Sequence, residues 1–179
     1  MLKIEEPTKE LFSNAKSGLL EVLAHPTPFD IGGALKAAEY ATHDFDGYID
    51  YLNKNKSKDQ PKGRVPSTTL WLFDDEKFIG LFDVRHSLNE VLKQQGGHIA
   101  YYIIPSCRGN GYTLRGLKLV LAWCKENLGL DEAWLFCNKE NNKSYRVLEH
   151  ALKDFGGQRL REHIIDGHIE CGYIIKIPQ

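Results

Sequence analysis

The segment from His98 to Cys124, HIAYYIIPSCRGNGYTLRGLKLVLAWC, constrains the fold more than any other part of the 179-residue sequence. A run of β-type residues ends at Pro105, a loop with Gly109 and Gly111 follows, and apolar residues then recur at helical spacing. A turn of this kind directs several backbone amides and the positive end of a helix dipole at one point. Glycine also lets the backbone approach phosphate oxygens closely. The segment therefore predicts a phosphate-binding loop between a strand and a helix.

Two common phosphate-binding patterns do not match this loop. The G-x-x-x-x-G-K-[ST] pattern of nucleoside triphosphate sites is absent from the sequence. The glycines Gly109, Gly111 and Gly116 read G-x-G-x-x-x-x-G, and no acidic residue closes a following strand as the dinucleotide fingerprint requires. The spacing therefore does not favour binding of ATP or NAD.

Composition excludes several broad classes of protein. A chain of 179 residues with 42% hydrophobic residues is long enough for one buried core, so we expect a single domain over 1–179. The net charge of −1 gives no general basic field for nucleic acid. The apolar runs are too short to span a bilayer, and the acidic N-terminus, MLKIEEPTKE, does not resemble a signal peptide. We therefore expect a cytoplasmic protein that binds neither membrane nor nucleic acid.

The cysteines also argue against a metal site. They form no C-x-x-C pair, so neither a zinc site nor a dense disulfide framework is predicted, and reduced thiols are expected. They are Cys107, Cys124, Cys137 and Cys171.

The periodicity divides the chain into a helical part, 1–66, and a sheet-containing part, 67–179. Apolar residues at helical spacing predict helices within 11–23, 34–38 and 45–52, and a polar loop rich in Pro and Gly follows over 53–66. Beyond it, the pattern predicts an antiparallel hairpin over 68–85 and a short helix or structured loop over 86–95.

The remaining elements alternate between strand and helix. The pattern predicts strands at 98–105 and 133–137, each followed by a helix, and the first of these helices ends at Gly129. A second helix, SYRVLEHALKDF, ends at Gly156. Asp166-Gly167 lies between two β-type runs and predicts a closing hairpin.

The phosphate loop resembles the acetyl-CoA signature of the GNAT superfamily, [QR]-x-x-G-x-[GA], in the setting of a strand, a proline and a long helix. The corresponding residues are Ile103-Ile104-Pro105 and Arg108-Gly109-Asn110-Gly111-Tyr112-Thr113, in which Thr113 departs from the usual Gly or Ala of the last position. The similarity extends from about Thr68 to about Gly157 and includes C-N-K-E-N-N-K-S at Cys137–Ser144. The motifs GGHIAY and P-S-x-R-G-x-G-Y also resemble a bacterial subgroup of predicted acetyltransferases.

This resemblance implies an α/β GNAT fold, with a mixed, mainly antiparallel sheet and flanking helices. Its central strands, around His98–Ile104 and Ala133–Cys137, are expected to splay apart and admit acetyl-CoA. Pantetheine would pair with the backbone of the first strand, and the pyrophosphate would lie on the loop amides. The implied donor-binding residues are Ile103, Ile104, Arg108, Gly109, Asn110, Gly111, Tyr112, Thr113, Asn141 and Ser144. For Asn141 and Ser144 a helix-capping role is an open alternative.

Two residues are predicted to be catalytic. An aliphatic ammonium group must lose a proton before it attacks a thioester, and His98 heads the strand expected beside that thioester. The family often places a tyrosine where this sequence has Leu148, and Tyr145 lies three residues earlier on the same helical face. Packing roles for both residues are open alternatives, as is acylation of Cys107 beside Arg108.

The predicted activity is direct transfer of an acetyl group from acetyl-CoA to a primary amine of a small molecule or peptide. Asp83, Arg85 and His86 end a strand near the expected acceptor side, although a solvated strand end would explain them equally well. The alternative function is a non-catalytic module that binds or senses acyl-CoA, which Leu148 favours. Pairing of two chains into a homodimer is left open.

Overall fold

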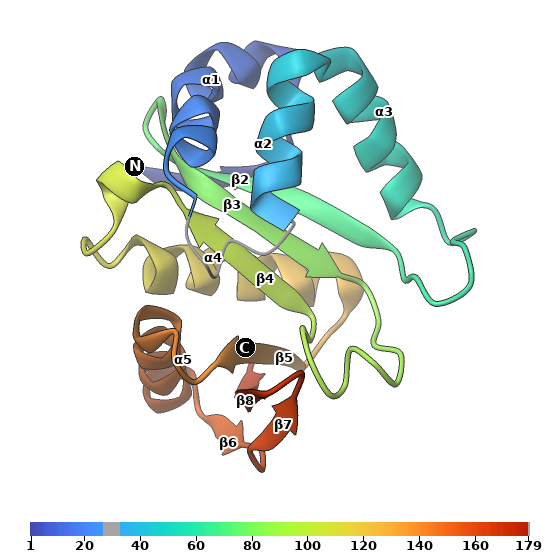
Figure 1. The fold of residues 1–179 in the computed structure, drawn as a ribbon, viewed down its shortest axis with the longest axis vertical. Coiled ribbons are helices and arrows are strands. Elements are labelled where there is room, and N and C mark those ends of the chain that lie inside the picture. The colour runs from blue at the N-terminus through green and yellow to red at the C-terminus, as the bar shows by residue number, and fades with distance from the viewer. Residues whose placement is uncertain (27–32, 179) are drawn as a thin grey trace.

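The structure is a computed structural model that describes residues 1–26 and 33–178 (Figure 1). The predicted N-terminal helices are confirmed as α1 (Lys9–Ala24), α2 (Gly33–His43) and α3 (Phe45–Lys56). The first region is helical as predicted, but the short strand β1 (Leu2–Glu5), which was not predicted, precedes the helices. β1 is an edge strand of four residues whose pairing with a distant strand supplies its stability, so it carries little local signal.

The first sheet has the strand order β1-β2-β3-β4, and every neighbouring pair is antiparallel. The predicted hairpin is formed by β2 (Ser67–Asp74) and β3 (Lys77–Arg85), and β4 (Ile99–Ile103) completes the sheet. The segment 86–95 forms turns instead of a helix, which selects the structured loop of the two alternatives.

The second half of the chain forms a separate sheet. After the short 3₁₀ turn η1 (Pro105–Cys107), α4 (Tyr112–Leu128) leads to β5 (Glu132–Asn138), and α5 (Asn142–Phe155) follows. β5 pairs antiparallel with β8 (His168–Lys176), which also pairs with β6 (Gly157–Arg159) and β7 (His163–Ile165). The predicted closing hairpin is therefore β7–β8, with its turn at Asp166-Gly167.

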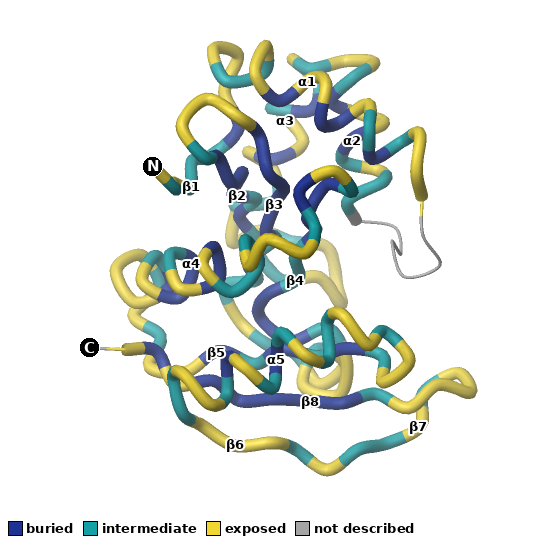
Figure 2. Tube along the Cα trace, turned by 90° about the vertical axis from the view of Figure 1, so that its left-hand side faces the viewer, coloured by how far each residue is buried: buried dark blue, intermediate teal, exposed yellow. Residues whose placement is uncertain are grey.

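The helices cover the first sheet on both faces (Figure 1). Phe45 of α3 packs against Trp71 on one face, and Gly116 of α4 lies against Leu72 and Phe82 on the other. Side chains alternate between faces along a strand, so odd-numbered residues of β2 and β3 point toward α1–α3 near the site described below. Figure 2 shows β2, β3 and β8 in the buried interior, whereas β6 is exposed.

Candidate active site

β4 and β5 meet at one end and separate beyond it, as predicted. The N–H of His98 donates to the carbonyl of Trp134 at 2.7 Å, and the N–H of Trp134 donates to His98 Nδ1 at 3.0 Å. Next to this joint, Gly97 forms a bridge with Leu135. Gly97 has a φ of 62°, and a Cβ there would lie 2.3 Å from the Trp134 carbonyl oxygen. Among the described residues, β4 otherwise pairs with β3, and β5 with β8.

His98 is built into this joint. It is 7% exposed, and burial lowers its pKa to about 4. Because Nδ1 accepts the Trp134 N–H, the neutral ring carries its proton on Nε2. To take up a proton, the ring would have to use Nδ1, which already accepts the Trp134 N–H. Its role as proton acceptor stays a prediction, and the structure shows it as a link between the two sheets.

The backbone of β4 alternates between β3 and the gap. The N–H of Arg85 donates to His98 O at 2.7 Å, and the N–H of Ile104 donates to Ile79 O at 3.0 Å. Antiparallel pairing makes alternate residues face the neighbouring strand, so Tyr101 and Ile103 direct their N–H and C=O groups into the gap. Of the two predicted pantetheine partners, Ile103 therefore faces the gap, while Ile104 also accepts from the Cys107 N–H.

The glycine loop presents free space at the start of α4, and among the described residues no side chain caps this end of the helix. Gly109 and Gly111 have φ values of 83° and 71°, and a Cβ at either position would meet no described atom within 4 Å. Gly111 is the N-cap of α4 and provides no capping side chain. By contrast, α1, α3 and α5 begin with capping side chains, those of Thr8, Asp44 and Asn141. The first-turn amides of α4 are thus open to an anion.

The other predicted loop residues mostly brace the loop. Arg108 Nε donates to the Ile103 carbonyl at 2.9 Å, and its guanidinium lies 5.0 Å from the Tyr102 ring centre. The Asn110 amide donates to the Cys107 and Arg108 carbonyls. The Tyr112 hydroxyl donates to Asp74 Oδ2 at 2.8 Å, which fixes the start of α4 against β2 and raises the pKa of Tyr112.

Thr113 lies half-buried in the first turn of α4. In α5, the capping alternative for Asn141 is confirmed, because its Oδ1 accepts the Ser144 N–H at 3.2 Å. Ser144 Oγ lies 2.6 Å from the Tyr101 hydroxyl. Tyr145 is half-buried, and the Arg159 guanidinium lies 5.4 Å from its ring centre. Leu148 is fully buried.

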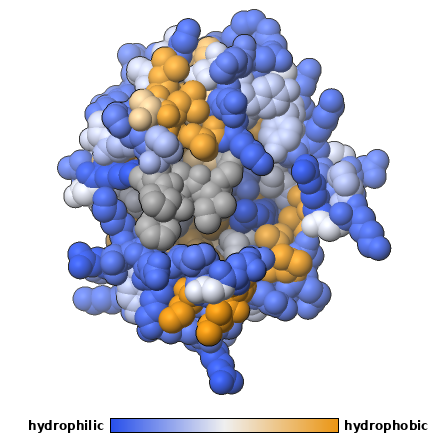
Figure 3. Space-filling view, viewed as in Figure 1, coloured by the Kyte–Doolittle hydropathy of each residue, from blue (hydrophilic) through white to orange (hydrophobic). Residues whose placement is uncertain are grey.

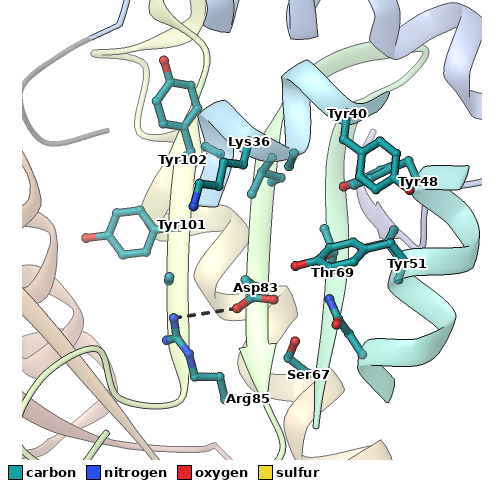
Figure 4. Close-up of a pocket in the computed structure, with 16 residues that line it drawn as sticks. Lys36, Tyr40, Tyr48, Tyr51, Ser67, Thr69, Asp83, Arg85, Tyr101 and Tyr102 are labelled. Atoms are coloured by element: carbon teal, nitrogen blue, oxygen red, sulfur yellow. Dashed lines mark ion pairs between the residues drawn. The ribbon is translucent and has the colours of Figure 1, made fainter. Parts of the chain in front are cut away.

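A cavity of about 630 Å³ lies on the α2–α3 side of the first sheet (Figure 4). Its floor consists of residues at period two on β2 and β3 and of the consecutive residues 100–102 on β4, and its walls come from α2 and α3. The polar floor residues are Ser67, Thr69, Asp83 and Arg85, and the tyrosines of its lining are Tyr40, Tyr48, Tyr51, Tyr101 and Tyr102. In Figure 4 the Tyr101 ring points away from the other lining side chains, and its hydroxyl bonds Ser144 of α5 on the gap side of β4. Tyr101 therefore stands between the cavity and the gap.

Asp83 is the one carboxylate among the described residues that line this cavity. Its side chain is 32% exposed, and burial raises its pKa, although Arg85 nearby partly opposes this shift. Arg85 Nη2 lies 3.8 Å from Asp83 Oδ2, while Nη1 donates to the Gly96 and Gly97 carbonyls at 3.1 Å. The sequence placed Asp83 near the acceptor side but left it as a solvated strand end. Asp83 and Arg85 lie two residues apart on β3, opposite Thr69 and Ser67 on β2. This spacing is the sequence pattern that indicates a shared polar floor.

The cavity tyrosines were missed, because helical periodicity alone does not show which aromatic residues of α2 and α3 face an opening.

In the part of the chain that the structure describes, no helix is long and apolar enough to cross a membrane. Within the same residues, no cluster of His, Cys, Asp or Glu could hold a metal ion. The face in Figure 3 is mostly hydrophilic, and its hydrophobic side chains form separate patches. Cytoplasmic location and homodimer formation stay predictions.

Comparison with known proteins gives one family. A family model described as an acetyltransferase (GNAT) domain matches residues 23–151. The sequence matches no curated protein. The fold is similar to a spermidine N-acetyltransferase chimera from Vibrio cholerae and hSSAT, with a TM-score of 0.59 and 15% identity over 98% of this chain and 95% of that chain.

Two further solved structures share the fold. A ribosomal-protein-S5-alanine acetyltransferase from Vibrio fischeri has a TM-score of 0.64 and 12% identity, over 98% of this chain and 93% of its own. An acetyltransferase from Salmonella typhimurium that modifies the N-terminal serine of ribosomal protein L7/L12 has a TM-score of 0.62 and 12% identity, over 99% and 95%.

Proposed function

Because this chain belongs to the GNAT acetyltransferase family, we propose that it transfers the acetyl group of acetyl-CoA to a primary amine bound in the cavity over β2, β3 and β4. One observation carries this proposal. The residue between the acceptor cavity and the gap, Tyr101, lies on the same strand as the backbone groups of Ile103 that face the gap. A donor in the gap and an amine in the cavity would therefore meet at β4.

The donor side fits acetyl-CoA by its chemistry. The open space at Gly109 and Gly111 and the uncapped amides of α4 suit a pyrophosphate. The gap-facing backbone groups of Tyr101 and Ile103 suit the amides of pantetheine. Among the described residues no strand pairs with these groups on the gap side. Acetyl-CoA would supply the acyl group as a thioester.

The Ile103 N–H is the amide we propose for stabilising negative charge on the acyl oxygen. It lies on the gap side of β4, and the Ile103 carbonyl is held by Arg108 Nε. Arg108 would therefore hold the following peptide group, between Ile103 and Ile104, and so brace the end of β4 beside this amide, in addition to any contact with the donor.

For the proton acceptor we propose Asp83. It lines the acceptor cavity and lies opposite Ala100, the residue before Tyr101. A raised pKa brings the carboxylate closer to the value that suits a general base near neutral pH. The alternative is His98, whose Nδ1 already accepts a hydrogen bond in the joint. Tyr145 is retained as the proposed donor of a proton to the departing thiolate.

The test is release of free thiol from acetyl-CoA with a panel of primary amines, combined with calorimetric measurement of CoA binding. An enzyme should release thiol in proportion to acetylated amine. The alternative, a non-catalytic acyl-CoA sensor, is supported by the buried Leu148 in place of a tyrosine. CoA binding without thiol release for any amine would favour that alternative. Competition of ATP with CoA would instead point to a nucleotide site.

A further inference from the structure

A second cavity, of about 310 Å³, adjoins the acceptor cavity. The two share four lining residues, which are Tyr51, Asn55, Ser67 and Arg85. The second cavity extends toward the loop before β2 and includes Gln60, Arg64 and Asn89. Together the two cavities form one groove, which we call the acceptor groove, with Asp83 in its inner part and Arg64 in its outer part.

The acceptor groove carries more positive than negative charge. Its described lining has three basic residues, Lys36, Arg64 and Arg85, but Asp83 is its single carboxylate. The charge of Asp83 is also partly balanced by Arg85 at 3.8 Å. Arg64 is exposed and makes no ion pair with the described residues, and in Figure 4 Lys36 extends from α2 toward β4. A polyamine, with several positive charges, would be repelled by such a lining.

On the basis of the proposed function, we infer that the acceptor is the amino terminus of a peptide that carries a carboxylate within its first residues. Its amine would lie beside Asp83 in the inner part of the groove. Its carboxylate would lie in the outer part, where the Arg64 guanidinium makes no ion pair with the described residues. Asp83 lines only the first cavity and Arg64 only the second, which favours a peptide over a free amino acid, because the two charged ends of an amino acid share one carbon atom.

The tyrosines of the inner part are consistent with this assignment. Tyr40, Tyr48 and Tyr51 give the wall an apolar body with polar edges, which suits the backbone and small side chains of a peptide. A strongly acidic lining, which a polycation would require, is absent from the described residues of the groove.

The experiment compares three acceptors at low ionic strength: the amidated dipeptides Ala-Asp and Ala-Lys, and spermidine. With the wild type, kcat/KM for Ala-Asp should exceed that for the other two by about tenfold or more, and added salt should reduce the preference. Arg64→Glu should reduce the ratio of Ala-Asp to Ala-Lys by at least about tenfold, with CoA affinity unchanged. Arg161→Glu, which makes the same charge change on the exposed β6–β7 loop, should leave the ratio as in the wild type.

A preference for spermidine, or an unchanged ratio in Arg64→Glu, would overturn the inference while leaving the enzyme assignment in place. Absence of thiol release with all three acceptors and with the wider amine panel, despite CoA binding, would overturn the proposed function itself. The two failures are thus distinguishable.

Discussion

The Tyr101 hydroxyl lies 2.6 Å from Ser144 Oγ, so a side-chain hydrogen bond joins β4 to the first turn of α5 across the gap between the sheets. Burial raises the pKa of Tyr101, which keeps the hydroxyl protonated at neutral pH. We expect Tyr101→Phe and Ser144→Ala each to lower the free energy of unfolding by about 1 kcal/mol. The double variant should lose less than the sum of the two, because both changes remove one bond. Strict additivity in denaturant unfolding would show that the bond contributes nothing.

Gly111→Asp should weaken CoA binding at least about tenfold, or ~1.4 kcal/mol, because a carboxylate would face the proposed pyrophosphate position. Gly129→Asp is a matched control at the other end of α4, since Gly129 has a φ of 67° and the same open surroundings. Both variants carry the strain of a non-glycine residue in the left-handed region. Gly111→Asn adds a side chain of similar size without the charge, so it separates the effect of charge from that of size. Calorimetry showing equal CoA affinity in all variants would remove the donor from this loop.

His98 should make stability depend on pH. Its pKa falls from an ordinary 6.5 to about 4 in the folded protein, so between these values the unfolded chain binds a proton that the folded chain does not. The stability that the neutral His98 ring contributes is fully present above pH 6.5. As the pH falls toward 4, the free energy of unfolding should drop by up to about 3 kcal/mol. His98→Gln, which keeps an acceptor for the Trp134 N–H, should lose this part of the pH dependence. Identical pH profiles for both proteins would contradict the placement of the ring.

Asp83→Asn should lower kcat/KM by about 10²- to 10⁴-fold if Asp83 accepts the proton of the ammonium group. CoA affinity and the free energy of unfolding should not fall, because the amide keeps the size of the side chain and removes a partly buried charge. His98→Gln tests the alternative in the same assay. A large loss of rate in His98→Gln, with full activity in Asp83→Asn, would return the role to the histidine.

Tyr145→Phe tests the proposed acid. If the Tyr145 hydroxyl protonates the thiolate, turnover should fall by about 10- to 1000-fold, with stability and CoA affinity nearly unchanged. The ring and its contact with Arg159 are retained in this variant, so the hydroxyl alone is tested. Full turnover would mean that Tyr145 serves packing and that water, or no acid, protonates the thiolate.

The elements predicted correctly are those with strong local signals. The helix after the glycine loop and the hairpin at Asp166-Gly167 follow from periodicity and turn chemistry, which act over a few residues. β1 was missed because its pairing with β2 joins residues about 70 positions apart, as in Leu2 and Asp74. The segment 86–95 has a helical pattern but folds as turns, with the Asn89 side chain accepting the Leu92 N–H.

The site was predictable in part for the same reason. The candidate loop residues Arg108–Thr113 are contiguous, so a single motif was enough to propose them. The acceptor groove combines residues of α2, α3, β2 and β3, and its shape arises only when these elements pack. The partners of His98 and Ser144 likewise lie on other elements, at Trp134 and Tyr101, and no spacing rule connects them.

Gly97 affects the spacing of β4 and β5 at the joint between the sheets. A side chain at position 97 would meet the Trp134 carbonyl. Because glycine has no side chain, the start of β4 can lie close to β5. Two strands hinged at one end open wider along their length when the hinge is wedged apart. A larger residue at position 97 is therefore expected to widen the gap beside Tyr101 and Ile103, from a position outside the proposed donor and acceptor sites.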